Sequence, residues 1–146
     1  MAGFSDYLEN KLIDFLFRGQ SFANPVIYVG LLTAAPTDSS AGTEVSGGAY
    51  ARVKAAAGST QALTDWKSTQ GTDAASTGTG GQTSNSAIVA FPSPTAAWGA
   101  VTHFGIYDAA SGGSLLFFGT LTAQKTVNSG DAAPTFAVGA LTVTLD

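Results

Sequence analysis

Residues 101–122 read VTHFGIYDAASGGSLLFFGTLT and contain two apolar runs of strand length, Val101–Asp108 and Ser114–Thr122. Between the runs stands Ser111 followed by two glycines, a combination that favours a tight turn because glycine adopts positive φ angles without steric cost. Two such runs joined by a glycine-rich turn predict an antiparallel β-hairpin. This hairpin is the most regular part of the chain, and it indicates that the fold is built on β-strands.

Further short strands are predicted on both sides of the hairpin. In the last of them, Leu141, Val143 and Leu145 alternate with threonines, which is typical of an antiparallel strand with one buried face. Proline and glycine separate the runs from one another. The sequence therefore predicts a mainly β fold, either an antiparallel β-sandwich or an open barrel. The additional strands are expected at Pro25–Leu32, Ala49–Ala55, Ser86–Phe91, Thr135–Val138 and Leu141–Leu145.

The N-terminal segment has the pattern of a helix over residues 5–18. Ser5 can cap its first turn, and Gly19 follows its last turn. No later segment has a comparable helical period. We therefore expect one N-terminal amphipathic α-helix within residues 1–20, followed by a β-sandwich domain over residues 21–146.

The apolar residues of this helix point in two directions. Leu8, Leu12, Phe15 and Leu16 form one stripe with Phe4, which we expect to pack on the sheet of the same chain. Ile13 and Phe17 lie outside that stripe, nearly opposite Leu8. They predict contact with another subunit, although loops of the same chain could also cover them.

Trp66 is the third candidate for a subunit interface, beside Ile13 and Phe17. Its alternatives are packing in the core or a loop, and stacking on a sugar. Trp66 falls within residues 58–86, which we interpret as a flexible insertion. Lys67–Ser86 has no large apolar side chain, so it is expected to add nothing to the core and to be ordered, if at all, by a neighbouring subunit.

The composition excludes several classes of protein. The chain has no cysteine, which excludes disulfides, thiolate metal sites and a cysteine nucleophile. Only 11% of its residues are charged and its net charge is −4, with six scattered cations, so binding to nucleic acid is not expected. There is no apolar run of the roughly 20 residues that cross a membrane, and the first residues do not resemble a secretory signal. We expect no membrane partner.

The sequence contains no pattern that favours an enzyme. His103 is the only histidine, and Asp108 lies five residues further along the same strand, roughly 17 Å away when the strand is extended. The glycines at 78, 80 and 81 are not followed by a helix or by a lysine that could hold phosphate. We therefore expect no catalytic residue, no cofactor and no metal ion.

Segments spread over most of the chain carry a resemblance to a known family. They are the opening helix, Gly42–Arg52, Thr83–Pro92, Trp98–Gly99, Val101–Asp108, Gly113–Gly119 and Lys125–Asp131. These segments resemble small structural proteins of tailed bacteriophages, which are usually described as tail-fibre or minor structural proteins and include proteins that coat a capsid. The resemblance covers most of the chain except about residues 55–82. It implies a non-enzymatic part of a symmetric assembly, located in the virion and assembled in the host cytoplasm.

Two functions compete within this resemblance. The first is capsid decoration, in which a cement protein stabilises the head by bridging neighbouring capsomers. Its partner would be the major capsid protein or another virion protein, and we expect a homo-oligomer, either a dimer or a trimer. The second is a tail-fibre or head-fibre module that binds glycans on the host surface. That function predicts an exposed aromatic cluster, with Trp66 and Tyr50 as candidates.

Overall fold

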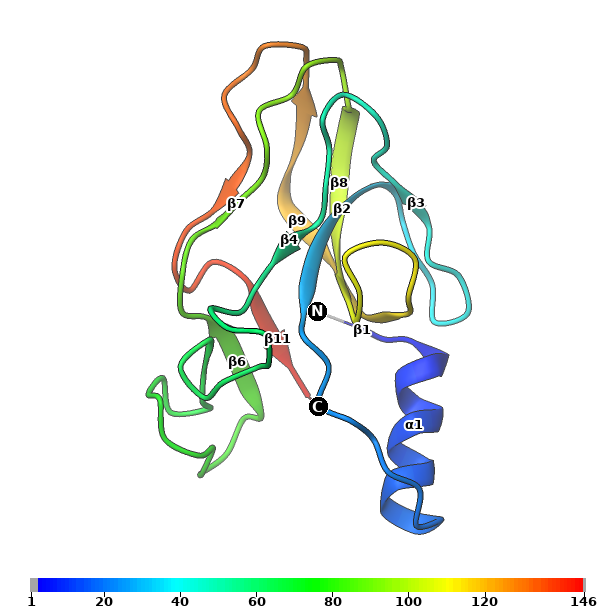
Figure 1. Ribbon diagram of the computed structural model, residues 1–146, viewed down its shortest axis with the longest axis vertical. Helices are drawn as coiled ribbons and strands as arrows, with labels where there is room; N and C mark the ends of the chain where they lie inside the picture. The colour runs from blue at the N-terminus through cyan, green and yellow to red at the C-terminus, as the bar shows by residue number, and fades with distance from the viewer. Residues whose placement is uncertain (1–2, 146) are drawn as a thin grey trace.

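In the computed structural model, which describes residues 3–145, the predicted hairpin is the centre of the largest sheet (Figure 1). Its strands β8 and β9 pair antiparallel, β2 lies against the other edge of β8, and β1 pairs with β9. Two short strands, β3 and β4, both pair with β2. The bounds are β1 (Gly3–Phe4), β2 (Tyr28–Ala34), β3 (Thr43–Glu44), β4 (Val53–Lys54), β8 (Gly99–Tyr107) and β9 (Leu115–Val127).

Two smaller antiparallel sheets pack against the large one. One joins β7 (Val89–Ala90) to β10 (Thr135–Phe136), and the other places β6 (Gln82–Asn85) between β5 (Trp66–Lys67) and β11 (Thr142–Thr144). The core lies between these sheets and the large sheet. Its buried side chains come from all three: Val29, Leu31, Val89, Phe91, Trp98, Val101, Phe104, Ile106, Val127, Leu141 and Val143.

These sheets confirm the predicted class: the protein is mainly β, its sheets are antiparallel and open, and it has one helix near the N-terminus. The helix is α1 (Asp6–Phe17), within one residue of the predicted span. The Ser5 hydroxyl caps it by accepting a hydrogen bond from the Leu8 amide, at 3.3 Å. Among the residues that the structure describes, no helix is long and apolar enough to cross a membrane.

The turn of the central hairpin explains its glycine pair. Gly112 and Gly113 have φ angles of 62° and 66°, in the left-handed region that glycine tolerates. The Asp108 carboxylate accepts a hydrogen bond from the Ser114 amide, at 2.6 Å, and so closes the turn. Asp108 thus caps its own turn, as aspartates in turns commonly do.

Strand β6 corrects the expectation that Lys67–Ser86 adds nothing to the core. Asn85 is only 1% exposed. Its amide nitrogen donates to the carbonyls of Ala87 and Ala137, at 2.7 and 2.8 Å, and its amide oxygen accepts from the Leu141 amide, at 2.9 Å. A polar side chain can be buried in this way when the backbone satisfies its hydrogen bonds, and a search for large apolar residues overlooks it.

Candidate assembly surface

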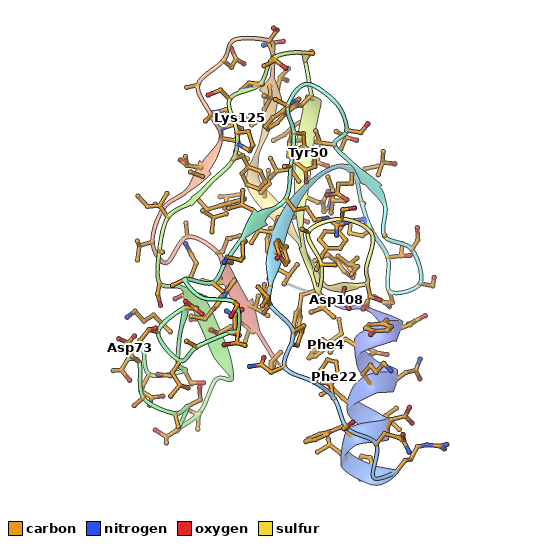
Figure 2. The ribbon with its side chains drawn as sticks, in the orientation of Figure 1. Phe4, Phe22, Tyr50, Asp73, Asp108 and Lys125 are labelled. Atoms are coloured by element: carbon orange, nitrogen blue, oxygen red, sulfur yellow. The ribbon has the colours of Figure 1, made fainter. Side chains whose placement is uncertain are left out.

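The N-cap of α1 is fixed to the start of β9. The Ser5 amide donates to the Leu116 carbonyl, at 3.0 Å, and the Ser5 hydroxyl donates to the Leu115 carbonyl. Just before Ser5 stands Phe4, which is labelled in Figure 2. Its ring packs on the Phe117 ring with 5.0 Å between their centroids. Leu8 is buried one turn later. The start of the helix is therefore held by backbone hydrogen bonds and by packing.

The rest of the helix leaves the sheet. Leu12 is only partly buried, and Phe15 and Leu16 are 52% and 65% exposed. The prediction that the whole stripe packs on the sheet of the same chain is thus wrong for Phe15 and Leu16. The reason is geometric, because α1 is anchored at Ser5 and its later turns extend past the end of the large sheet (Figure 1).

Ile13 and Phe17 are also exposed, at 51% and 80%. Together with Phe15 and Leu16 they form what we call the helix patch, which surrounds the last turns of α1, with Phe15 on the side opposite Ile13 and Phe17. A fully exposed large apolar side chain presents roughly 200 Å² to water, so the patch leaves about 500 Å² of apolar surface uncovered. Patches of this size on soluble monomers are commonly functional. An ion pair between Asp14 and Arg18, with 2.8 Å between nitrogen and oxygen, borders the patch.

Trp66 does not belong to the helix patch. Its ring packs against the core, and its indole nitrogen donates to the Ala55 carbonyl, at 3.1 Å. The structure therefore places Ile13 and Phe17 on one surface and Trp66 on another. Trp66 does line an apolar hollow that Ile27, Phe117 and Leu145 also line.

Tyr50 and Trp66 do not form the exposed aromatic pair that a glycan site at these residues requires. Tyr50 packs edge-to-face on Trp98 and stacks on Phe91, with ring centroids 5.4 and 6.1 Å apart. Its hydroxyl donates to the Glu44 carboxylate and accepts from the Leu31 amide, each at 2.8 Å. The Tyr50 ring and hydroxyl are thus used for contacts inside the fold, which corrects the expected cluster.

A partly buried ion pair beside Tyr50 was not predicted from the sequence. The Arg52 guanidinium donates two hydrogen bonds to the Glu44 carboxylate, at 2.8 and 2.7 Å. It also donates to the carbonyls of Ala109 and Gly112, at 2.9 and 2.7 Å. Arg52 therefore ties β3 and its own segment to the turn of the central hairpin. The available signal was the scarcity of charge, because each charged residue in such a chain is a candidate for a specific contact.

Burial and the charge of Glu44 shift the pKa values of three neighbouring side chains, Tyr50, Arg52 and Tyr107. Burial raises the pKa of Tyr50, and the nearby Glu44 carboxylate adds to the effect. Burial alone would lower the pKa of Arg52, but the hydrogen bonds and the charge of Glu44 outweigh it, so the pKa is raised. Burial raises the pKa of Tyr107 to about 12. The Arg52 guanidinium lies over the Tyr107 ring, 3.4 Å from its centroid.

The side chains of His103 and Asp108, which were considered for catalysis, make hydrogen bonds within their own strand or turn. His103 is a partly buried strand residue, and its ring Nδ1 lies 2.8 Å from the Thr102 hydroxyl. Asp108 accepts a hydrogen bond from a backbone amide in its own turn, and Asp131, which was not a catalytic candidate, does the same in another turn. Within residues 3–145, no three histidine, cysteine, aspartate or glutamate side chains lie close enough together to hold a metal ion.

Comparison with known proteins identifies the family of this chain. The family described as Podophage GP4 fiber I protein gp80 matches residues 3–144, which is almost the whole chain. No curated protein matches the chain. The match agrees with the resemblance carried by the opening helix and the central hairpin, and fibre proteins are components of the virion. The chain therefore belongs to the Podophage GP4 fiber I protein gp80 family, a family of phage structural proteins of the fibre type.

Proposed function

We propose that this protein is a non-enzymatic subunit of a virion fibre and that it is joined to its assembly through the helix patch. The observation that carries the proposal is the position of four large apolar side chains on the free end of α1. Ile13, Phe15, Leu16 and Phe17 are each more than half exposed, while the start of the same helix is held on β9. A helix presented in this way is suited to docking against another protein.

The energetics favour a covered patch. Burying one large apolar side chain contributes roughly 1.5–3 kcal/mol, so the helix patch as a whole can outweigh the entropy lost on association. In water, the same four side chains would promote aggregation on a surface that has few charges. In a structural subunit such a patch stabilises the contact with the rest of the assembly, whereas a freely diffusing protein has no such contact to stabilise.

The ionisable groups support a structural function. Glu44 and Arg52 are bonded to each other, and the Asp65 carboxylate accepts from the amides of Ala57 and Ala62, at 2.8 and 2.7 Å. Groups held in this way stabilise loops, as expected of a structural subunit. Turnover of a capsule polysaccharide or of peptidoglycan by the purified protein would contradict the non-enzymatic function.

Capsid decoration, the first function inferred from the sequence, differs from a fibre in the number of copies. Decoration requires hundreds of copies in each virion, and a fibre requires tens at most. The family description names a fibre, and for that reason we favour the fibre.

The experiment is to purify the virions and to measure the amount of this protein against the major capsid protein on a stained gel. Immunogold labelling of the same virions then shows where the protein lies. We expect tens of copies, with gold particles at fibres on the tail or the head. Hundreds of copies spread over the capsid surface would replace the fibre with decoration, and absence from the virion would contradict both.

A further inference from the structure

An open depression of about 410 Å³ lies beside the loop between β5 and β6. Trp66 forms one of its walls, and amide and hydroxyl side chains form most of the others. These polar side chains come from segments that are far apart in the sequence: Asn24, Gln61, Ser68, Ser76 and Thr83. An aromatic ring bordered by groups that both donate and accept hydrogen bonds is suited to a ligand with an apolar face and a polar rim. We call this site the polar depression.

The side chains of Trp66 and Gln61 are held in place by the same backbone carbonyl. The Ala55 carbonyl accepts a hydrogen bond from the Trp66 indole nitrogen, at 3.1 Å, and another from the Gln61 amide nitrogen, at 3.0 Å. The Gln61 amide oxygen in turn accepts from the Ile27 amide, at 3.1 Å. Because both side chains are fixed before a ligand arrives, binding costs little side-chain entropy.

The loop that forms another wall is fixed by its own polar groups. The Thr69 amide donates to the Ser76 hydroxyl, at 3.2 Å, and the Gln70 side chain bonds to Ala75 and Thr77, at 2.8 and 3.0 Å. Since the Ser76 hydroxyl is the acceptor in its bond, it can still donate its own proton to a ligand. The loop thus has a defined shape although it has no large apolar side chain.

The charges around the polar depression disfavour an anionic ligand. Among the described residues that line it, Lys67 carries the charge, and its ammonium group is paired with the Asp73 carboxylate, at 2.5 Å. A phosphate group would have to displace that carboxylate. An apolar peptide would leave the amide and hydroxyl groups of the walls without partners. A neutral ligand that carries several hydroxyl groups meets neither obstacle.

We propose that the polar depression binds a sugar, with one face of a neutral pyranose ring stacked on Trp66 and its hydroxyls bonded to the side chains around it. A pyranose combines an apolar C–H face with a rim of hydroxyl groups, which is the combination that these walls fit. The proposal goes beyond the assembly function, because it gives the single subunit a ligand of its own. It also gives the polar loop a function, although Tyr50 takes no part in the site.

The polar depression and the helix patch lie on different sides of the molecule. Asp73, which is labelled in Figure 2, lies in the loop beside the depression, and α1 lies on the opposite side of the same end. Attachment through α1 would not by itself cover the depression. One surface of a subunit can therefore join it to the virion while the other contacts a saccharide.

The test uses variants that alter the polar depression but keep Trp66, because that ring also packs against the core. One variant replaces residues 70–79 with a short Gly/Ser linker and so removes the loop wall. The other is Ser76→Phe, which puts a bulky ring into the depression from an exposed position. Val138→Ser is the matched control, because Val138 is more than half exposed but does not line the depression. Circular dichroism and melting curves verify that every variant is folded.

Saturation-transfer-difference NMR of the purified full chain measures binding. The probes are methyl glucoside, methyl galactoside and N-acetylglucosamine, together with O-polysaccharide and capsular polysaccharide prepared separately from the host. We expect wild type to bind at least one probe with a Kd on the order of 1 mM, as is usual for so small a ligand. The two polysaccharides distinguish the two sources of sugar on the host surface.

The linker variant and Ser76→Phe should bind the same probe more than about tenfold more weakly, and Val138→Ser should bind it like wild type. Tryptophan fluorescence of wild type should change on binding. Trp98 is only 5% exposed, so Trp66 is the tryptophan that a ligand reaches.

Three results would overturn the proposal. Failure of wild type to bind any of the probes would exclude a sugar site. Binding that persists in both altered variants would place the ligand on another surface. Binding without a change in fluorescence would exclude stacking on Trp66. All three concern a ligand of the isolated chain, so they are distinct from the copy number and position that test the fibre.

Discussion

Arg52 illustrates how much a single charged residue contributes in a chain of this composition. Only 11% of the residues are charged, against roughly 25% in an ordinary domain. Arg52 nevertheless joins three segments, because its planar guanidinium donates to Glu44, to Ala109 and to Gly112 at the same time. Lysine has the same charge but cannot reproduce this fork of donors.

We therefore predict that Arg52→Lys lowers the free energy of unfolding by roughly 1–3 kcal/mol, since the partly buried Glu44 carboxylate and the carbonyls of Ala109 and Gly112 lose hydrogen-bond donors. Urea denaturation measures the loss. Arg18→Lys is the matched control, because the ion pair of Arg18 with Asp14 is exposed and should change stability by less than about 1 kcal/mol. Equal losses in the two variants would contradict the structural role assigned to Arg52.

The buried tyrosines predict a loss of stability at alkaline pH. The pKa of Tyr107 is raised to about 12, and that of Tyr50 is raised as well. An unfolded chain releases its tyrosine protons near pH 10, before the folded chain does. The free energy of unfolding should thus be unaffected by these groups below about pH 9 and fall between about pH 10 and pH 12, by up to about 1.4 kcal/mol per pH unit for each tyrosine.

Urea denaturation of wild type and Tyr107→Phe across this range checks the prediction. The Tyr107 hydroxyl is buried and has no hydrogen-bond partner among the described residues. Its removal should therefore leave the free energy of unfolding at pH 7 unchanged or raise it by up to about 1 kcal/mol. The alkaline slope of the variant should be smaller than that of wild type. An identical slope would mean that Tyr107 does not contribute.

At the scale of elements, strand β6 and the loop before it have opposite roles although both are polar. The loop between β5 and β6 is bonded largely to itself, for example through the side chain of Gln70 to the carbonyl of Ala75 and the amide of Thr77. Strand β6 instead pairs with β5 and β11 and carries the buried Asn85. Hydrophobicity does not distinguish the two segments, but their hydrogen-bond partners do.

We predict that replacing residues 70–79 with a short Gly/Ser linker shifts the melting temperature by less than about 3 °C. Asn85→Ala should instead lower the free energy of unfolding by roughly 3 kcal/mol or more, because it leaves the Leu141 amide and two carbonyls without partners. The exposed Asn24→Ala is the control. A large drop caused by the linker would make the loop part of the fold.

At the scale of the whole molecule, stability should depend on protein concentration. Association that involves only folded chains stabilises them by mass action. We predict that the melting temperature of wild type rises over a roughly hundredfold increase in concentration, whereas that of the Ile13→Ser, Phe17→Ser variant stays constant. Differential scanning fluorimetry measures both, with Val138→Ser expected to follow wild type. A constant wild-type value would indicate that the isolated chain does not associate.

Local signals were sufficient for the helix and the central hairpin of this fold, but not for the short strands β1, β3, β5 and β6. The Ser5 cap, the 3.6-residue period up to Phe17 and the turn at Gly112 and Gly113 each act within a few residues of the chain. Such signals can be read directly from the order of side chains, because their physics is local. They predicted the helix within one residue at each end, the central hairpin and the antiparallel β class, and the opening helix and hairpin also carried the resemblance to phage structural proteins.

The exposed surfaces of the protein depend on contacts between residues that are far apart in the sequence. The path of α1 depends on a hydrogen bond from Ser5 to Leu115, and that contact decides that Phe15 and Leu16 lie in water. The hollow needs β5, β8, β9 and β11 in one place, and Arg52 reaches Gly112 across 60 positions of the chain. Helical periodicity states which side chains share a face, but only the packing of other elements decides whether that face is covered.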